Sequence, residues 1–429
     1  MDRHVLAVAG RSGRASRGLF ALLTAAIPAS AESGSLAGFY AEGVPPLSSA
    51  SASVEVKRVD EPLYTGPSSQ SPKRGAAQVG ARLPIFGASR GPGCRGRWFL
   101  VGPHAFICEE GVQPSPASPL PLDAAPRATF QGLPYRYFFV GAQGSFGYRS
   151  LADAEEGVPD AQYQPGFGVA VERVANKPGA DPFGLTSHGF WIPLRDLAGS
   201  ATLPFQGSAW SADLAWIEGD AAPLFVSPGQ RRPGKTLERL TQVRVLHTAT
   251  RGRERYVQVG ESDWLRESDI VRPSISPPPA EITTAERWID VDLKRQTAVA
   301  YLGDKPVFAT LVSSGRGRAN SESATPSGTF RLWVKLRTSD MDDLEDVDQL
   351  QNYAIEAVPW VMFFHQGYGV HGAFWHRRFG EVRSHGCVNL APVDAERLFH
   401  WTSPRLLPGW AAVFPTPHEP GTLVRIRDE

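Results

Sequence analysis

Glycine and proline interrupt the hydrophobic pattern of this chain more often than in an average globular protein. The sequence has 43 glycines and 37 prolines among 429 residues. Glycine weakens a helix and proline removes a backbone donor from its interior, so the composition favours a β-rich protein over a helical bundle. The apolar runs between them are short, and several alternate apolar with polar residues as half-buried strands do. The sequence therefore predicts a mainly β protein with many turns and linkers.

The charge balance argues against a nucleic-acid partner. The chain carries 44 basic and 44 acidic side chains, a formal net charge of zero, and it has no long run of Lys or Arg. Nucleic-acid binding normally requires a basic surface, so we expect no such partner. No segment after the first thirty or so residues is long and apolar enough to be a membrane-spanning helix, so we expect no stable span in the mature chain.

The N-terminus has the three parts of an export signal in the expected order. Arginines form a basic leader, the apolar stretch Gly18–Ile27 follows, and Ala29–Ala31 offers small residues for cleavage. We expect a signal peptide over 1–31 and a mature protein in the periplasm or cell wall. A disordered tail or a misplaced start codon is the alternative.

Cysteine usage fits an oxidising compartment. Cys94 and Cys108 lie on either side of the apolar run Trp98–Val101, and the turn at Gly102–Pro103 could bring them face to face. We expect them to form a disulfide, which leaves Cys387 as the remaining thiol.

Composition divides the rest of the chain. Residues 32–79 are rich in Ser, Ala, Pro and Gly and are expected to be a flexible linker. Residues 80–279 show short β-type runs and form an accessory region, in which 141–185 has no clear pattern. The stiff Ser274–Pro279 segment marks a boundary. We expect a further domain over 284–416 and a C-terminal tail over 417–429.

Two parts of the accessory region have similar patterns. Leu83–Phe86 and Ala222–Phe225 each lead through a loop to an aromatic strand, a glycine and a second strand. This pattern resembles the small Src-homology-3-type (SH3-like) barrels that accompany bacterial wall enzymes, near 82–112 and 220–272. One irregular β-rich domain is the alternative.

The C-terminal third has the clearest pattern. Trp288–Leu293 alternates with Ile289, Val291 and Leu293 on one face, and strands are also expected over Ala298–Leu302, Val307–Val312 and Thr329–Leu336. The one helix expected here is Val393–Trp401, and the acidic stretch 340–348 is expected to be an exposed loop.

This third also contains a cysteine in a reactive setting. His371–Gly372 is followed by the segment Ser384–Asn389, which reads Ser-His-Gly-Cys-Val-Asn. A thiol needs a nearby base or donors to act as a nucleophile, and His371 could supply that base. Gly386 would let backbone N–H groups near Cys387 approach a developing oxyanion.

The segment Val370–Asn389 resembles the catalytic signature of the L,D-transpeptidases with a YkuD-like domain. Supporting features are Trp288–Asp292 as a first strand, Thr325–Phe330 before the middle strand, and Pro359–Met362 ahead of the His-Gly pair. The resemblance covers about 285–415. It implies a β-sandwich-like catalytic domain with one short helix, no cofactor, and peptidoglycan stem peptides as substrates.

The resemblance also implies residue roles. Cys387 would be the nucleophile and His371 the general base, with its ring oriented by the carbonyl of Gly372. The backbone of Gly386 and Cys387 would form the oxyanion hole, and we expect the thiolate of Cys387 to be stabilised there. The remaining assignments are loop residues Ser384 and His385 and substrate contacts Asn389, Trp375 and Met362. The reaction would release D-alanine from a tetrapeptide stem and transfer the acyl group to an amine on another stem or on a wall-linked protein.

Three alternatives stay open beside this interpretation. Zinc could bind His365, His371, His376, His385 and Cys387, but paired metal-ligand spacing is missing, so we expect no metal site and expect His365 and His376 to be structural or rim residues. The same fold could act as an L,D-carboxypeptidase or hydrolase. The chain could also be a non-catalytic peptidoglycan-binding wall protein.

Overall fold

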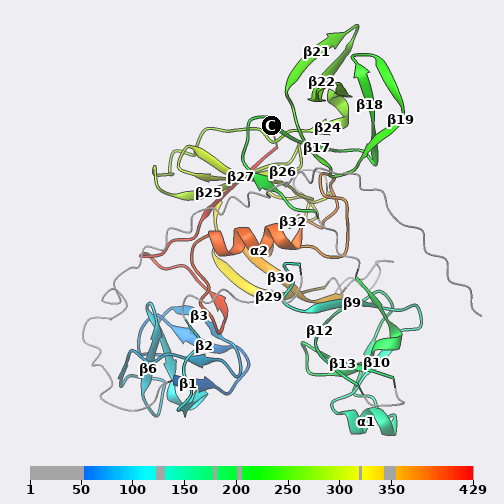
Figure 1. Ribbon diagram of the computed structural model, residues 1–429. Helices are drawn as coiled ribbons and strands as arrows, with labels where there is room; N and C mark the ends of the chain where they lie inside the picture. Colours follow the sequence, from blue (N-terminus) through cyan, green and yellow to red (C-terminus); the bar gives the residue numbers. More distant parts are fainter. Residues whose placement is uncertain are drawn as a thin grey trace, which may run out of the picture. The chain divides into compact units, whose positions relative to one another are not determined.

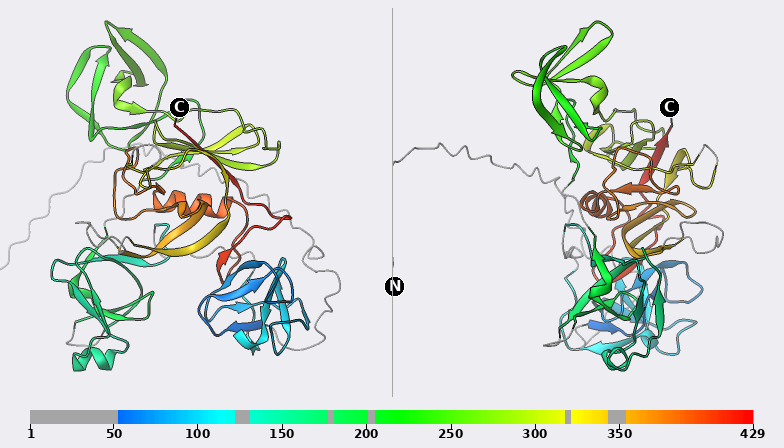
Figure 2. Two further views of the ribbon diagram at one scale, coloured as in Figure 1. Left: turned by 180° about the vertical axis from the view of Figure 1, so that it is seen from behind. Right: turned by 90° about the vertical axis from the view of Figure 1, so that its right-hand side faces the viewer.

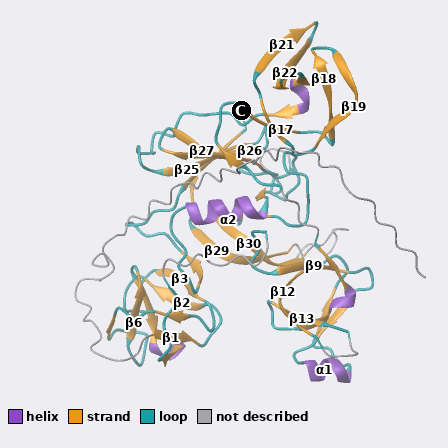
Figure 3. Cartoon of the chain, viewed as in Figure 1, coloured by secondary structure: helices purple, strands orange, loops and turns teal. Residues whose placement is uncertain are grey.

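The computed structural model describes residues 53–121, 131–176, 181–200, 205–317, 321–342 and 354–428. The expected signal peptide and residues 32–52 of the expected linker lie outside these ranges. The described part is mainly β, as predicted, with two α-helices, α1 (Leu151–Glu156) and α2 (Pro392–Trp401) (Figure 3). Neither has the length or hydropathy that crossing a membrane requires.

The first group of strands begins within the segment expected to be a linker. Its strands are β1 (Ser53–Val56), β2 (Glu61–Tyr64), β3 (Lys73–Ala77), β4 (Arg82–Leu83), β5 (Gly87–Ser89), β6 (Trp98–Gly102), β7 (Ala105–Cys108) and β8 (Val112–Ser115). The linker prediction is therefore wrong from Ser53 onward, and the group is larger than 82–112. The composition of this segment suggested a linker because the polar residues of the turn over 65–72 outnumber the apolar ones. The side chains of Val54, Leu63 and Ala77 on either side of that turn are nevertheless buried.

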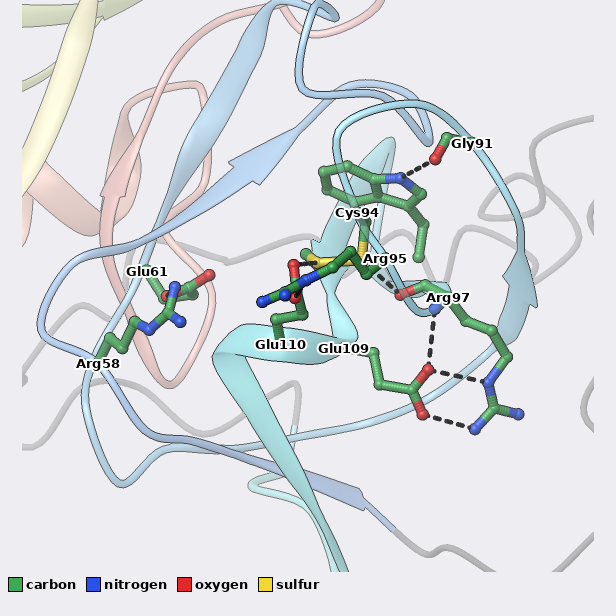
Figure 4. The surroundings of a disulfide bond; sticks show 10 residues. Arg58, Glu61, Gly91, Cys94, Arg95, Arg97, Glu109 and Glu110 are labelled. Carbon is green, nitrogen blue, oxygen red and sulfur yellow. Dashed lines mark hydrogen bonds and ion pairs between the residues drawn. A yellow bond between two sulfur atoms is a disulfide. The ribbon is translucent and has the colours of Figure 1, made fainter.

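The expected disulfide is confirmed within this group. Cys94 and Cys108 are bonded across a sequence separation of 14 residues (Figure 4). A small core of Trp98, Leu100 and Phe106 packs beside them. The Trp98 indole N–H donates to the Gly91 carbonyl at 3.3 Å. The bond thus closes the loop that leads into the most buried strand of the group.

A second group of strands occupies the region that the sequence left without a pattern. It comprises β9 (Arg136–Val140), β10 (Ser145–Gly147), β11 (Ala161–Tyr163), β12 (Gly168–Ala175), β13 (Phe183–Thr186), β14 (Trp191–Pro193) and β15 (Leu197–Gly199), together with α1. Ser150 begins α1 by accepting the Asp153 N–H, and Gly157 ends it with a φ of 71°.

The third group contains the second expected barrel. Its strands are β16 (Ser208–Ala209), β17 (Leu214–Ile217), β18 (Ala221–Ser227), β19 (Gln230–Glu238), β20 (Gln242–Arg244), β21 (His247–Arg251), β22 (Glu254–Gly260), β23 (Asp263–Arg266) and β24 (Ile270–Val271). Apart from β16, they form a three-stranded sheet, β20-β17-β24, and a five-stranded sheet, β19-β18-β23-β22-β21. The core between these strands includes Ile217, Leu224, Val257 and Leu265.

One short pattern recurs in all three groups. A strand is followed by a three-residue 3-10 turn and then by another strand, with the turns at Glu109–Gly111, Leu194–Asp196 and Glu267–Asp269. The sequence predicted a likeness between the first and third groups from a different pattern, and it predicted neither these turns nor the likeness of the second group. The SH3-like assignment itself stays a prediction.

The C-terminal domain contains two sheets and α2 (Figure 1). Its strands are β25 (Arg287–Asp292), β26 (Thr297–Leu302), β27 (Lys305–Leu311), β28 (Gly328–Arg331), β29 (Val334–Asp342), β30 (Ala354–His365), β31 (Tyr368–Gly372), β32 (Val388–Leu390), β33 (Trp410–Val413) and β34 (Leu423–Arg427). One sheet has the order β16-β27-β26-β25-β34-β28, and β29 to β33 belong to the other. The prediction of an acidic loop over 340–348 is wrong for 340–342, which end β29 and pair with β30, and the remaining residues lie outside the described ranges.

The segment expected to be a C-terminal tail is a strand of this domain. β34 lies parallel to β25, with Asp290 opposite Arg425 and Asp292 opposite Arg427. Both carboxylates are buried, and Asp290 accepts from the Nε of Arg425 at 2.7 Å and the Nε of Arg427 at 2.9 Å. The prediction of a C-terminal tail is therefore wrong. The arginines of this segment pair with the acidic side chains of β25, and this pairing allows both carboxylates to be buried.

The predicted helix Val393–Trp401 is confirmed as α2, and buried charges hold it at both ends. Asp394, in its first turn, accepts from the Gly207 N–H at 2.9 Å and from the Thr310 hydroxyl at 2.5 Å. Lys335 on β29 is completely buried, and its ammonium donates to the carbonyls of Phe399 and Thr402 near the helix C-terminus. The helix is thus bonded to β27 in one sheet and to β29 in the other, as its place in Figure 1 suggests.

Lys335 should make stability depend on pH above neutrality. Burial lowers the pKa of Lys335 from 10.5 to about 7. Between these values the unfolded chain binds the proton more strongly, so this group lowers stability as pH falls from 10.5 towards 7, with no further change below. We expect wild type, relative to Lys335→Met, to gain roughly 1.4 kcal/mol in free energy of unfolding per pH unit within that window. Guanidinium unfolding at pH 6, 8 and 9.5 measures this, and parallel pH profiles of the two proteins would contradict it.

Candidate functional site

The two halves of the cysteine motif meet through a pair of short parallel strands. β31 pairs with β32 so that Val370 is opposite Val388 and His371 is opposite Asn389. Cys387 lies in the turn directly before β32, one residue from Val388. The pairing therefore brings the turn that carries Cys387 next to the strand that carries His371.

His371 is buried and neutral. Its Nδ1 lies 3.2 Å from the Gly372 carbonyl oxygen, which can only accept, so Nδ1 carries the proton and Nε2 offers a lone pair. The ring stacks on Trp375 with centroids 5.7 Å apart. Burial lowers the pKa of His371 to about 4. This imidazole can therefore accept a proton at neutral pH.

Cys387 is partly exposed and, in the resting state, protonated. Its thiol faces the Gly367 carbonyl at 3.8 Å. Burial raises the pKa of Cys387, and a hydrogen bond from the backbone N–H of Gly369 lowers it only in part. The expectation of a stabilised resting thiolate is therefore not met, because the surroundings of the sulfur penalise charge more than they support it.

A network of hydrogen bonds fixes the turn that presents Cys387. The Ser384 hydroxyl donates to the Cys387 carbonyl, and the Gly386 N–H donates to that hydroxyl oxygen at 3.1 Å. The Thr325 hydroxyl donates to the Gly386 carbonyl at 2.7 Å. Because the Gly386 amide is already bonded within the turn, its assignment as an oxyanion donor is wrong for this conformation. Gly386 is a loop residue, and the Cys387 amide stays a prediction.

Gly386 has a backbone conformation that suits only glycine. Its φ is +124°, and a Cβ added there would lie 2.5 Å from Cε1 of Tyr368. The Tyr368 hydroxyl in turn donates to the Glu322 carbonyl at 2.9 Å. The ring of Tyr368 therefore packs directly against the turn, which explains why the motif requires glycine at this position.

Asn389 contacts a second histidine. Its Nδ2 is placed 3.0 Å from Nε2 of His376, and Nδ1 of His376 accepts the Arg378 N–H at 3.3 Å. A neutral ring that accepts at Nδ1 carries its proton on Nε2, so it needs the amide oxygen of Asn389 opposite it. As placed, Oδ1 of Asn389 is buried with no partner, and exchanging the two amide atoms gives it one. Asn389 therefore anchors the loop through His376, and His376 is structural rather than a rim residue.

The other predicted site residues lie in different surroundings. His385 is exposed, with Nε2 2.9 Å from Nη2 of Arg316. Trp375 is partly exposed beside His371 and stays a predicted substrate contact. Met362 has no exposed surface, and its sulfur accepts from the Thr402 hydroxyl at 3.3 Å. The prediction that Met362 contacts substrate is therefore wrong, because the residue lies in the core between β30 and α2.

Sequence reasoning missed several supports of the site. They are Thr325, Tyr368 and Arg316, together with the contact between His376 and Asn389. Only Thr325 had a usable signal, since it belongs to the Thr325–Phe330 segment already singled out. The others act through contacts between loops that no spacing rule predicts.

The side chains considered for zinc do not gather into a three-ligand group in the described part of the chain. The one such group found there is Cys94, Cys108 and Glu110, with ligand atoms within 4.8 Å of one another (Figure 4). Its two sulfurs are joined in the disulfide and cannot act as thiolate ligands.

Gly386→Ala should destabilise the protein. The added methyl group must displace Tyr368 or the turn, and it forces an unfavourable positive φ on alanine. We expect the free energy of unfolding to fall by about 1–3 kcal/mol and iodoacetamide to label Cys387 at an altered rate. Gly199→Ala is the matched control, because a Cβ there meets nothing within 4 Å. Equal unfolding curves for the two variants would contradict the role of Gly386.

Several solved structures are similar to this chain. Among solved structures, the chain is similar to a Cys-to-Ser mutant of Enterococcus faecium L,D-transpeptidase, with 23% identity over 33% of this chain and 50% of that one and a TM-score of 0.26. It is also similar to L,D-transpeptidases of Stackebrandtia nassauensis (24% identity, 35% and 58% covered, TM-score 0.24) and Mycobacterium tuberculosis (17% identity, 41% and 70% covered, TM-score 0.24).

The coverage of these proteins is partial, and the chain spans half the length of the Enterococcus faecium enzyme. A search of curated protein sequences found no match. The family model described as the L,D-transpeptidase catalytic domain, YkuD, matches residues 286–426. Residues 286–426 are therefore an L,D-transpeptidase catalytic domain of the YkuD family.

Proposed function

We propose that this protein is an exported peptidoglycan L,D-transpeptidase in which Cys387 is the nucleophile and His371 the general base. One observation carries the proposal: the β31–β32 pairing brings a neutral, proton-accepting imidazole next to the strand that begins one residue after a partly exposed thiol. The catalytic domain to which both belong acts on peptidoglycan stem peptides in its family.

The first half of the reaction forms a thioester. His371 takes the thiol proton at Nε2 as the sulfur attacks the stem-peptide carbonyl, because a resting thiol with a raised pKa needs a base at the moment of attack. The carbonyl oxygen becomes an oxyanion, for which the Cys387 amide is the proposed donor. Collapse breaks the peptide bond, and the amine of the leaving D-alanine receives the proton from His371.

The second half regenerates the enzyme. An acceptor amine attacks the thioester, gives a proton to His371 and displaces the thiolate, which takes that proton back. The acceptor is an amine on another stem or on a wall-linked protein. Water in its place would give L,D-carboxypeptidase activity, and the product of the reaction distinguishes the two.

Export to the periplasm or cell wall is part of the proposal. The N-terminal sequence pattern and the Cys94–Cys108 disulfide support it, since disulfides persist in oxidising compartments. The substrate is also found outside the cytoplasm.

Substitution of the two catalytic residues should abolish turnover. Cys387→Ala removes the nucleophile, and His371→Ala removes the group that takes its proton. D-Alanine release from a tetrapeptide-stem fragment and the mass of a covalent carbapenem adduct measure the effect. His247→Ala, an exposed position on β21, is the control and should match wild type. D-Alanine release by Cys387→Ala at the wild-type rate would refute the mechanism.

The pH profile should report the buried histidine. Burial lowers the pKa of His371 to about 4, so the ring stays unprotonated and competent as pH falls well below the usual 6.5. We expect single-turnover acylation by a carbapenem to lose half its rate near pH 4. A midpoint near pH 6.5, with circular dichroism showing an intact fold, would mean that His371 is not the base or is not buried in solution.

A further inference from the structure

The loop between the two halves of the motif is held by the third group of strands. Arg239, between β19 and β20, donates from Nη2 to the Phe379 carbonyl at 2.8 Å, and its Nη1 pairs with Glu381 at 3.2 Å. The same guanidinium donates to the Glu218 carbonyl in its own group. Its side chain is only 12% exposed, so these bonds are largely shielded from water. The guanidinium makes these contacts from two nitrogens held in a rigid plane, whereas a lysine ammonium would have to make them from a single nitrogen.

Further ion pairs tie the same loop together. Arg378 pairs with Asp220 of the third group at 2.6 Å and with Glu381 at 3.3 Å, and Arg383 pairs with Glu381 at 2.7 Å. Asp220 is 77% exposed, so its pair contributes little by itself. Glu381 is the centre of the network, and Arg239 is its least exposed partner.

An apolar contact lies beneath these charges. Phe379 is buried and stacks on Phe205 with ring centroids 5.8 Å apart. Both belong to a hydrophobic cluster that also contains Trp216 of the third group and Trp288 and Leu311 of the catalytic domain. The third group and the catalytic domain thus share one core.

The anchored loop reaches the catalytic pair through His376. His376 bonds to the side chain of Asn389, which lies opposite His371 on the neighbouring strand. The loop ends at Ser384, whose hydroxyl donates to the Cys387 carbonyl and so fixes the cysteine turn. A displacement of Phe379 or Glu381 therefore acts on both ends of the site.

We propose that Arg239 is a positioning residue for the acyl transfer, and that the third group of strands supports the catalytic loop in addition to any role in binding the wall. This inference rests on the proposed function for its kinetic part. In this proposal the third group of strands helps to position the catalytic loop. The contact is the Arg239 guanidinium, which bonds to Phe379 and Glu381 of the loop and to Glu218 of its own group.

The test compares Arg239→Met with a matched arginine of the same group. Arg244 pairs with Asp213 at 2.6 Å, and its side chain is 69% exposed, so Arg244→Met removes an ion pair that does not involve the loop. Arg239→Lys keeps the charge without the planar fork. Three quantities are measured on the full chain: the carbapenem acylation rate at saturation with its half-saturating concentration, the pH profile of that rate, and iodoacetamide labelling of Cys387.

We expect Arg239→Met to slow saturated acylation about ten-fold or more, because misplaced reacting groups lose rate steeply. The acid midpoint should move up towards 6.5 as water reaches His371, and the iodoacetamide labelling rate should change. Arg239→Lys should recover part of the rate, and Arg244→Met should match wild type. Circular dichroism and melting temperature establish that each variant is folded.

The outcomes separate the two hypotheses. If wild type forms no carbapenem adduct and releases no D-alanine, the proposed function fails, and iodoacetamide labelling still tests the positioning role. If Arg239→Met matches Arg244→Met in labelling rate and acid midpoint, the positioning role is refuted. Should Arg239→Met fail to fold, Glu381→Gln removes the charge at the other end of the contact, and wild-type behaviour of that variant overturns the proposal.

Discussion

The parallel pairing of β31 with β32 is the contact on which the site depends. It places His371 opposite Asn389, which lies two residues after Cys387. The outer edge of β32 is held as well, since the backbone N–H and carbonyl of Asn389 each bond to Ser313 at 2.9 Å. A strand of three residues with partners on both sides has little freedom to slip, and a slip of one residue would turn the Asn389 side chain to the other face of the sheet.

The accessory groups are joined to this domain by backbone pairing and by a shared core. β3 of the first group pairs with β33, and β12 of the second pairs with β30. In the second group the Tyr137 ring stacks on Phe374 at 4.0 Å, three residues after His371. Such contacts differ from those of modules on flexible tethers, because they bond or pack each group directly against strands or loops of the C-terminal domain.

The sequence predicted those features that have a local cause. The α2 helix, the first strand pair of the catalytic domain, the disulfide and the cysteine motif all follow from spacing and periodicity. Features that depend on distant partners were missed. The burial of Asp290 was not predicted, because its partners Arg425 and Arg427 lie more than 130 residues away in β34. The strand character of 53–77 was hidden because its polar turns dominate the composition.

Within the site, the same distinction holds. His371, Gly372, Ser384 and Cys387 were found because motif residues are close in sequence. Met362 was misplaced because its nearness along the chain gave no information on which face of β30 it occupies. His376, Tyr368 and Arg239 act through contacts between loops and groups, and a single sequence carries no record of such contacts.

The position of β34 joins the last segment of the catalytic domain to its first strand. β25 can pair with β26 as soon as their hairpin exists, and Asp292 has a nearby partner in Arg295 at 3.1 Å. Asp290, however, is buried and pairs with Arg425 and Arg427 of the last strand. A chain that ended before residue 423 would keep β31 and β32, yet it would bury the carboxylate of Asp290 without these two arginines. The sheet that begins with β25 therefore depends on the final segment of the chain for the counter-charge of its first strand.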